Sequence, residues 1–172
     1  LIEQENYDVL IYCFPIQKLI IPSFIIIISA FSFNVCINLQ KIEIPTNSEL
    51  EIIENGAFKN KYFSNFTIPH HLIKIDEDSF AYCVNLKKIQ IHENSELQII
   101  GKNAFKCSKI ESFYAPPHLK QINESAFGYK LIIIEFGDNS EIEFINPTFQ
   151  FGNCSNIIFM ISQKLINYIN LL

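Results

Sequence analysis

The chain repeats one pattern of apolar and polar positions at intervals of 21 to 26 residues, most often 23 or 24. Two long stretches show it best, CINLQKIEIPTNSELEIIENGAF at residues 36–58 and CVNLKKIQIHENSELQIIGKNAF at residues 83–105. Each unit contains a six-residue phrase whose first, fourth and sixth positions are apolar, except that the last and weakest has Ser162 at the sixth. The seven phrases open at Ile16, Leu39, Phe63, Leu86, Ile110, Leu131 and Ile157. A fixed period in this range indicates a protein built from stacked repeats.

Each phrase predicts one short β-strand. The fifth position between the two apolar ones is mostly polar, as in Glu43, Thr67 and Gln90, and such alternation is typical of a half-buried strand. In four units a proline follows the phrase, where it can end a strand without removing an interior hydrogen bond. These prolines are Pro22, Pro45, Pro69 and Pro116.

A second apolar segment follows in each unit and leads to a phenylalanine. We expect the repeated phenylalanines to be Phe31, Phe58, Phe80, Phe105, Phe127 and Phe149. Asp76 and Asn103 stand just before two of them and could cap a single helical turn. Alternate units also insert an Asn-Ser-Glu step, which predicts a surface turn. The insertions begin at Asn47, Asn94 and Asn139.

Together these features predict a repeat solenoid of about seven coils of 23–24 residues. It would have a parallel β-sheet on one face and short turns or single helical turns on the other. One unit cannot bury its own Ile, Leu and Phe side chains, whereas stacked units cover each other. We expect one domain over residues 1–172, with clear repeats at about 13–168. A composition of 49% hydrophobic and 18% charged residues fits such a globular chain.

Charge and hydropathy limit the alternatives. The net charge is −5 and the 13 basic residues are scattered singly, which argues against nucleic-acid binding. Residues 19–39 carry no charge and are long enough to span a membrane, although Pro22 and the β-branched isoleucines argue against a helix there. A membrane protein built around this stretch stays an alternative. The chain begins at Leu1 without signal-peptide features, so we expect a piece of a longer protein.

The five cysteines follow the repeat. Each precedes a phrase by three residues, and Asn60 and Gly128 take this place in the two other units. We expect buried thiols at a tight corner, since free cysteine packs as a small hydrophobe. The pairs in adjacent coils, Cys13 with Cys36 and Cys83 with Cys107, are those for which strand spacing alone would allow a bridge. The full set is Cys13, Cys36, Cys83, Cys107 and Cys154.

No pattern indicates catalysis or a cofactor. The sequence has no G-x-S-x-G, H-E-x-x-H or phosphate-binding glycine loop, so we expect neither an enzyme nor a small-molecule substrate. His71 and His118 lie two coils apart, too far to share a zinc ion. We therefore expect no metal and a row of solvated histidines. These are His70, His71, His92 and His118.

The outward positions of the strands are the candidate contact face. Alternation turns the third and fifth residues of each phrase to solvent, and solenoids use such extended surfaces for recognition. Tyr114 is the best anchor, because tyrosine is enriched among interface hot spots. Outward Ile20, Ile133, Phe159 and Ile161 would make both ends apolar. The candidate residues are Lys41, Glu43, Asn65, Thr67, Lys88, Gln90, Ser112, Tyr114 and Glu135.

The phrase C-x-N-L-x-x-I-x-I-P followed by L-x-x-I-x-x-x-A-F resembles the BspA-like leucine-rich repeat of surface antigens in anaerobic bacteria and parasitic protists. The resemblance implies a leucine-rich repeat solenoid in a non-enzymatic, cell-surface or secreted adhesion protein. It implies a host, matrix or cell-surface protein as the ligand. Membrane anchoring would then come only from segments outside this chain. The alternative is an intracellular leucine-rich repeat scaffold that binds a cytosolic protein, which the expected thiols favour.

Overall fold

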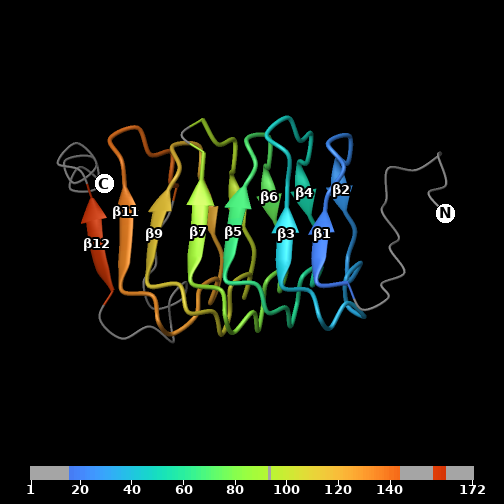
Figure 1. The fold of residues 1–172 in the computed structure, drawn as a ribbon. Coiled ribbons are helices and arrows are strands. Elements are labelled where there is room, and N and C mark those ends of the chain that lie inside the picture. The colour runs from blue at the N-terminus through green and yellow to red at the C-terminus, as the bar shows by residue number, and fades with distance from the viewer. Residues whose placement is uncertain (1–15, 93, 144–156, 162–172) are drawn as a thin grey trace.

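A computed structural model describes residues 16–92, 94–143 and 157–161. Over these residues the chain winds into a parallel β-solenoid of about six turns, and they contain no helix. Seven strands lie side by side in chain order on one face, which we call the strand face (Figure 1). They are β1 (Lys18–Ile20), β3 (Lys41–Glu43), β5 (Asn65–Ile68), β7 (Lys88–Ile91), β9 (Ser112–Ala115), β11 (Ile133–Phe136) and β12 (Ile158–Ile161). The predicted solenoid is confirmed.

A second parallel sheet runs behind the strand face (Figure 1). Its five short strands are β2 (Ile27–Ile28), β4 (Ile52–Ile53), β6 (Lys74–Ile75), β8 (Ile99–Ile100) and β10 (Gln121–Ile122). The register joins Ile53, Ile75 and Ile100, so the same buried isoleucine recurs from coil to coil. Strands and turns thus stand where single helical turns were one expectation, and neither Asp76 nor Asn103 caps a helix.

Between the two sheets lies a ladder of stacked phenylalanine rings. Successive ring centroids are 4.9, 5.3, 5.3 and 5.4 Å apart, close to the spacing of the strands themselves. Every ring is almost completely buried. The ladder consists of Phe33, Phe58, Phe80, Phe105 and Phe127. Aromatic contact from coil to coil therefore runs through the core from Phe33 to Phe127.

The first ladder residue is Phe33, and the prediction of Phe31 was wrong. Phe31 is 52% exposed and has a φ of 57°, in the left-handed region. Each coil has such a residue two positions before its ladder phenylalanine, where the chain makes a tight turn. The others are Gly56, Asp78, Asn103 and Ser125. At Gly56 an added Cβ would stand 2.5 Å from Cε1 of Phe31, so this ring covers the glycine of the next coil.

Residues 19–39 form β1, β2 and connecting turns, not one continuous helix. Among the described residues, no helix is long and apolar enough to cross a membrane. The spanning helix considered for this stretch is therefore wrong.

Candidate functional site

Strand register arranges the outward side chains in two rows along the strand face. One row runs through Lys18, Lys41, Asn65, Lys88, Ser112, Ile133 and Ile158. The other runs through Ile20, Glu43, Thr67, Gln90, Tyr114, Glu135 and Met160. All nine candidate contact residues lie in these rows, and their role in binding stays a prediction.

The last strand differs from the expectation by one residue. Glu135 pairs with Met160, which places Met160 and Ile158 on the outside, 50% and 55% exposed. Phe159 instead packs against the core. The phrase of this unit begins one residue earlier than its apolar pattern indicated, and a one-residue shift turns every side chain of a strand to the other face. The side chain of Ile161 lies outside the described part of the chain.

In the amino-terminal part of the strand face, outward polar side chains of neighbouring strands bind each other. The Glu43 carboxylate lies 2.8 Å from the Lys18 ammonium and 2.7 Å from that of Lys41. Both hydrogen bonds lower the pKa of the Glu43 carboxyl, and the one from Lys18 has the larger effect. One strand pair further on, the Thr67 hydroxyl donates to the Gln90 side-chain oxygen at 3.0 Å. Polar groups here already satisfy each other.

The carboxyl-terminal part presents apolar side chains instead. Tyr114 is 49% exposed and shares its row with Met160, although the exposed Glu135 lies between them. Ile133 and Ile158 pair in the neighbouring row. The Tyr114 hydroxyl reaches the turn after β11, where a Cβ added to Gly137 would stand 3.1 Å from it. We call Tyr114, Ile133, Ile158 and Met160 the apolar cluster. Tyrosine and methionine are enriched at protein interfaces.

Two hollows separate the hydrogen-bonded strand groups β1–β3, β5–β7 and β9–β11–β12 of the strand face. The first has a volume of about 630 Å³ and lies between β3 and β5. The second, of about 400 Å³, lies between β7 and β9. It is lined by Lys87, Lys88, Lys109, Glu111, Ser112 and Lys130. We call this second hollow, with its four lysines, the basic hollow. The expectation that basic residues are scattered singly was therefore wrong at this place.

The cysteines do not all share one position or one state. Cys36 is disulfide-bonded, so the expectation of thiols throughout was wrong, while Cys83 and Cys107 are free. The Cys83 thiol donates to the Phe58 carbonyl at 3.1 Å, and burial raises its pKa to about 12. Cys13 and Cys154 lie outside the described part of the chain.

Cys107 lies one position away from the place that the repeat predicted for it. Its φ of 61° matches that of Asn60 and Tyr82 in the preceding coils. Ser108 and Lys61 occupy the buried place that corresponds to Cys83. The buried Lys61 finds main-chain acceptors there, because its ammonium donates to the Lys59 carbonyl at 2.9 Å and to the Asn34 carbonyl at 3.4 Å.

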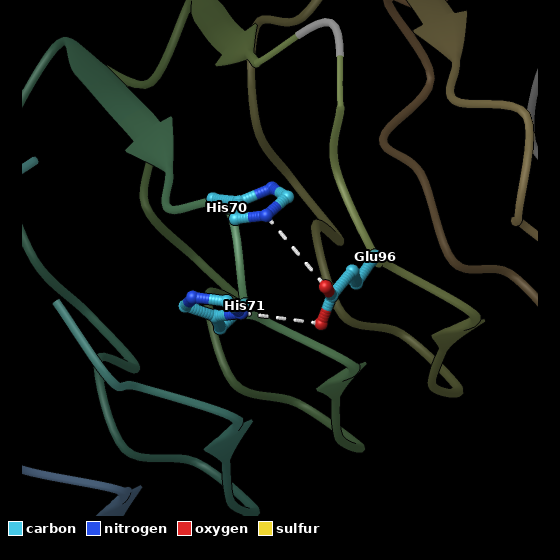
Figure 2. A group of neighbouring side chains, drawn as sticks. All are labelled: His70, His71 and Glu96. Carbon is cyan, nitrogen blue, oxygen red and sulfur yellow. Dashed lines mark hydrogen bonds and ion pairs between the residues drawn. The ribbon is translucent and has the colours of Figure 1, made fainter. Parts of the chain in front are cut away.

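The histidines meet glutamates of the Asn-Ser-Glu turns. His118 Nδ1 lies 2.9 Å from Glu141, and His71 Nδ1 lies 3.3 Å from Glu96. They belong to separate turns, as the spacing predicted. The sequence did not reveal that His70 also reaches Glu96, at 3.6 Å from Nε2 (Figure 2). Glu96 is 25 residues from His71 along the chain, so only the recurring Asn-Ser-Glu turn could have indicated the pairing.

The sequence pattern of the "BspA type Leucine rich repeat region" matches residues 6–133 in six copies. The chain belongs to this family. The solved structure of the pneumococcal vaccine antigen PcpA is similar to it, with a TM-score of 0.64 and 23% identity, over 72% of this chain and 31% of that chain. The comparison with curated proteins found no match.

Two further solved structures share fewer features with the BspA-type chain. A leucine-rich cell surface protein from Faecalibacterium prausnitzii A2-165 is 15% identical, with a TM-score of 0.45 over 88% of this chain and 62% of that one. A leucine-rich repeat protein from Bacteroides ovatus ATCC 8483 is 17% identical, with a TM-score of 0.35 over 85% of this chain and 56% of that one. The chain thus spans less than two thirds of each of these proteins.

Membership in the BspA-type family defines the general class of activity. Leucine-rich repeat solenoids are typically non-enzymatic scaffolds whose extended surfaces bind other proteins. The strand face of this chain is an extended surface whose two halves differ in chemistry.

Proposed function

We propose that this BspA-type repeat binds a protein partner through the apolar cluster, as part of a cell-surface adhesion or antigen protein. One observation carries the proposal. Ile133 pairs with Ile158 across β11 and β12, and Met160 lies two residues further along β12 on the same face. Tyr114 lies on β9 of the same hydrogen-bonded group, with Glu135 between it and Met160. Scattered apolar residues are normal on a surface, whereas grouped ones indicate an interaction site. The strands also hold these side chains in place before binding, which lowers the entropy cost of association.

The surroundings of the cluster indicate the chemistry of the partner. The basic hollow lies directly before β9 and contains four lysines against the single acid Glu111. A partner with an apolar anchor and acidic residues at its rim fits both features. The lysines would mainly speed encounter, since exposed charges affect the association rate more than the final affinity.

We propose that this part of the protein lies outside the cell. The disulfide at Cys36 supports it, because disulfides persist in oxidising compartments. The free thiols of Cys83 and Cys107 favour the second candidate, an intracellular scaffold for a cytosolic protein. The two candidates share the binding face and differ in the compartment.

Surface labelling of intact cells separates them. The full-length protein is labelled with a membrane-impermeant amine reagent and captured with an antibody against this region. Labelling of intact cells is the expected result. Signal that appears only after permeabilisation would contradict the adhesion proposal and favour the intracellular scaffold.

The binding face is tested with a matched pair of tyrosine variants. Candidate host and matrix proteins are immobilised, and binding of the chain is measured by surface plasmon resonance. Tyr114→Ala should weaken binding by more than about tenfold, since truncation of a hot-spot residue costs about 2 kcal/mol or more. Tyr62→Ala is the control, because Tyr62 is 53% exposed but lies outside the strands. Equal effects of both variants would exclude the apolar cluster as the contact site.

A further inference from the structure

We propose that His70, His71 and Glu96 form a binding site for a divalent cation of the zinc type at the rim of the solenoid. Their ligand atoms all lie within 4.8 Å of one another (Figure 2). Among the described residues, no other group of three such side chains comes this close. The site is separate from the apolar cluster, so it does not depend on the proposed protein binding.

The distances suit a metal ion without large rearrangement. Ligands held about 2.1 Å from a tetrahedral zinc ion stand roughly 3.4 Å from each other. Here His70 Nε2 lies 3.6 Å from one Glu96 oxygen, and His71 Nδ1 lies 3.3 Å from the other. The two imidazole rings are 4.4 Å apart between centroids and tilted by 53°. Figure 2 shows both rings on the same side of the carboxylate.

The backbone fixes the three side chains to neighbouring coils. His70 and His71 follow Pro69 in the turn after β5, and Glu96 belongs to the Asn-Ser-Glu turn after β7. The Glu96 amide donates to the His70 carbonyl at 2.9 Å, so main-chain bonding holds the two turns together at this point. A bound cation would add a second link between the same coils.

The donor set selects the kind of cation. Two imidazole nitrogens and one carboxylate suit Zn²⁺ and similar transition metals, whereas Ca²⁺ and Mg²⁺ require more oxygen ligands. Three protein ligands leave a fourth position for water, and the side chains of His71 and Glu96 are 50% and 43% exposed. A cation bound here would therefore be exposed to solvent.

His70 can reach the cation through one nitrogen. Its Nδ1 atom is shielded from solvent and has no hydrogen-bond partner among the described residues, while Nε2 faces Glu96. Metal-binding histidines usually donate their second nitrogen to a partner, and losing such a partner costs about 10- to 100-fold in affinity. We therefore expect weaker binding than at a structural zinc site that has this support.

Two equivalent turns in the same chain serve as internal comparisons. The amide of Glu49 donates to the Ser23 carbonyl and that of Glu141 to the Pro117 carbonyl, both at 2.8 Å, as Glu96 does to His70. The three turns share this main-chain hydrogen bond but differ in the side chains beside the glutamate. Pro117 with His118 supplies one histidine, and Ser23 with Phe24 supplies none. Only the middle turn combines two histidines with the glutamate.

The test is calorimetric titration of the chain with ZnCl₂. The chain carries no histidine tag, and Cys107→Ser is present throughout to exclude that thiol as a ligand. We expect one Zn²⁺ per chain and a rise in melting temperature with zinc. His71→Ala and Glu96→Gln should each weaken binding by more than about 100-fold, since a direct ligand matters more than its outer-shell partner. His118→Ala should leave the affinity unchanged.

A gain-of-site variant makes the test independent of lost stability. Pro117→His places a second histidine beside His118 and Glu141, and it should raise the stoichiometry to two Zn²⁺ per chain. Melting temperatures without zinc show whether each variant is folded. The proposal is overturned if the chain with intact His70, His71 and Glu96 binds no zinc. It is also overturned if binding survives Glu96→Gln or falls equally in His118→Ala.

Discussion

The phenylalanine ladder and the strand face arise from the same repeat but differ in what each coil keeps. In the ladder, one side chain recurs in five coils, and every ring is buried against the next. On the strand face, a single row changes from Glu43 through Thr67 to Tyr114 and Met160. Interior positions must match the shape of their neighbours, whereas outward side chains have solvent beside them. Repetition therefore specifies the fold, whereas the outward positions can change from coil to coil without disturbing it.

The largest expected effect is the loss of one ring from the middle of the ladder. Phe80 stacks on Phe58 and Phe105 and also contacts Phe63 and Phe66. Phe80→Ala should lower the free energy of unfolding by roughly 3–5 kcal/mol, because it removes buried area and leaves a cavity. Urea denaturation followed by circular dichroism measures it.

The matched change on the strand face is Tyr114→Ala. It removes an exposed aromatic residue, so the free energy of unfolding should change by no more than about 0.5 kcal/mol. Equal losses in Phe80→Ala and Tyr114→Ala would show that the strand face also contributes strongly to stability. The contrast between the two regions would then be wrong.

A second pair tests which phenylalanine opens the ladder. Phe33 is buried and stacks on Phe58 at 4.9 Å, whereas Phe31 covers Gly56 from outside. Phe33→Ala should lower the free energy of unfolding by about 3 kcal/mol, at the lower end for buried phenylalanine, because among the described residues Phe33 stacks on one ring, that of Phe58. Phe31→Ala should cost much less. Urea midpoints of the two variants decide the order, and a reversed order would restore the expectation for Phe31.

The solenoid and its strands could be predicted because their signal is local and recurs in every unit. The boundary of a turn is a weaker signal. Both Ala30-Phe31 and Ser32-Phe33 fit the phenylalanine position, and the sequence favoured the first since other units place alanine there. The sequence spacing from the paired strand residue identifies Phe33 as the ladder residue. Phe33 follows Ile28 by five residues, as Phe58 follows Ile53, and Ile28 pairs with Ile53.

The candidate site could be predicted only in part, because it depends on contacts between coils. Tyr114 was found from alternation within its own strand. The outward position of Met160 was missed, because β12 pairs one residue out of step with its apolar pattern. The groups formed by Lys88 with Lys109, and by His70 with Glu96, join residues that are far apart in sequence. No single unit contains either group.

A smaller effect is expected in the rates of thiol labelling, which compare a buried cysteine with one on a turn. Cys83 is fully buried and its pKa is raised to about 12, so little thiolate exists at neutral pH. Cys107 is half-buried on a turn. Iodoacetamide should therefore modify Cys107 in the folded chain, and Cys83 only after denaturation. Mass spectrometry of peptides after timed labelling follows both sites. Equal rates under native conditions would show that the coil around Cys83 opens readily.

The smallest effect concerns the polar half of the strand face. The hydrogen bond from Lys18 is the largest cause of the lowered pKa of Glu43, and that from Lys41 is the second. Lys18→Met should therefore raise this pKa towards its ordinary value more than Lys41→Met does, as read by NMR titration of the carboxyl carbon. Because the folded pKa is lowered, any stabilisation is present above the ordinary glutamate pKa and is lost as the pH falls through the folded value. The Glu43 side chain is 37% exposed, so added salt should weaken the shift. A pKa that stays unchanged in both variants would show that the two ammonium groups do not hold Glu43 in solution, and that this half of the face is as free to contact a partner as the apolar cluster.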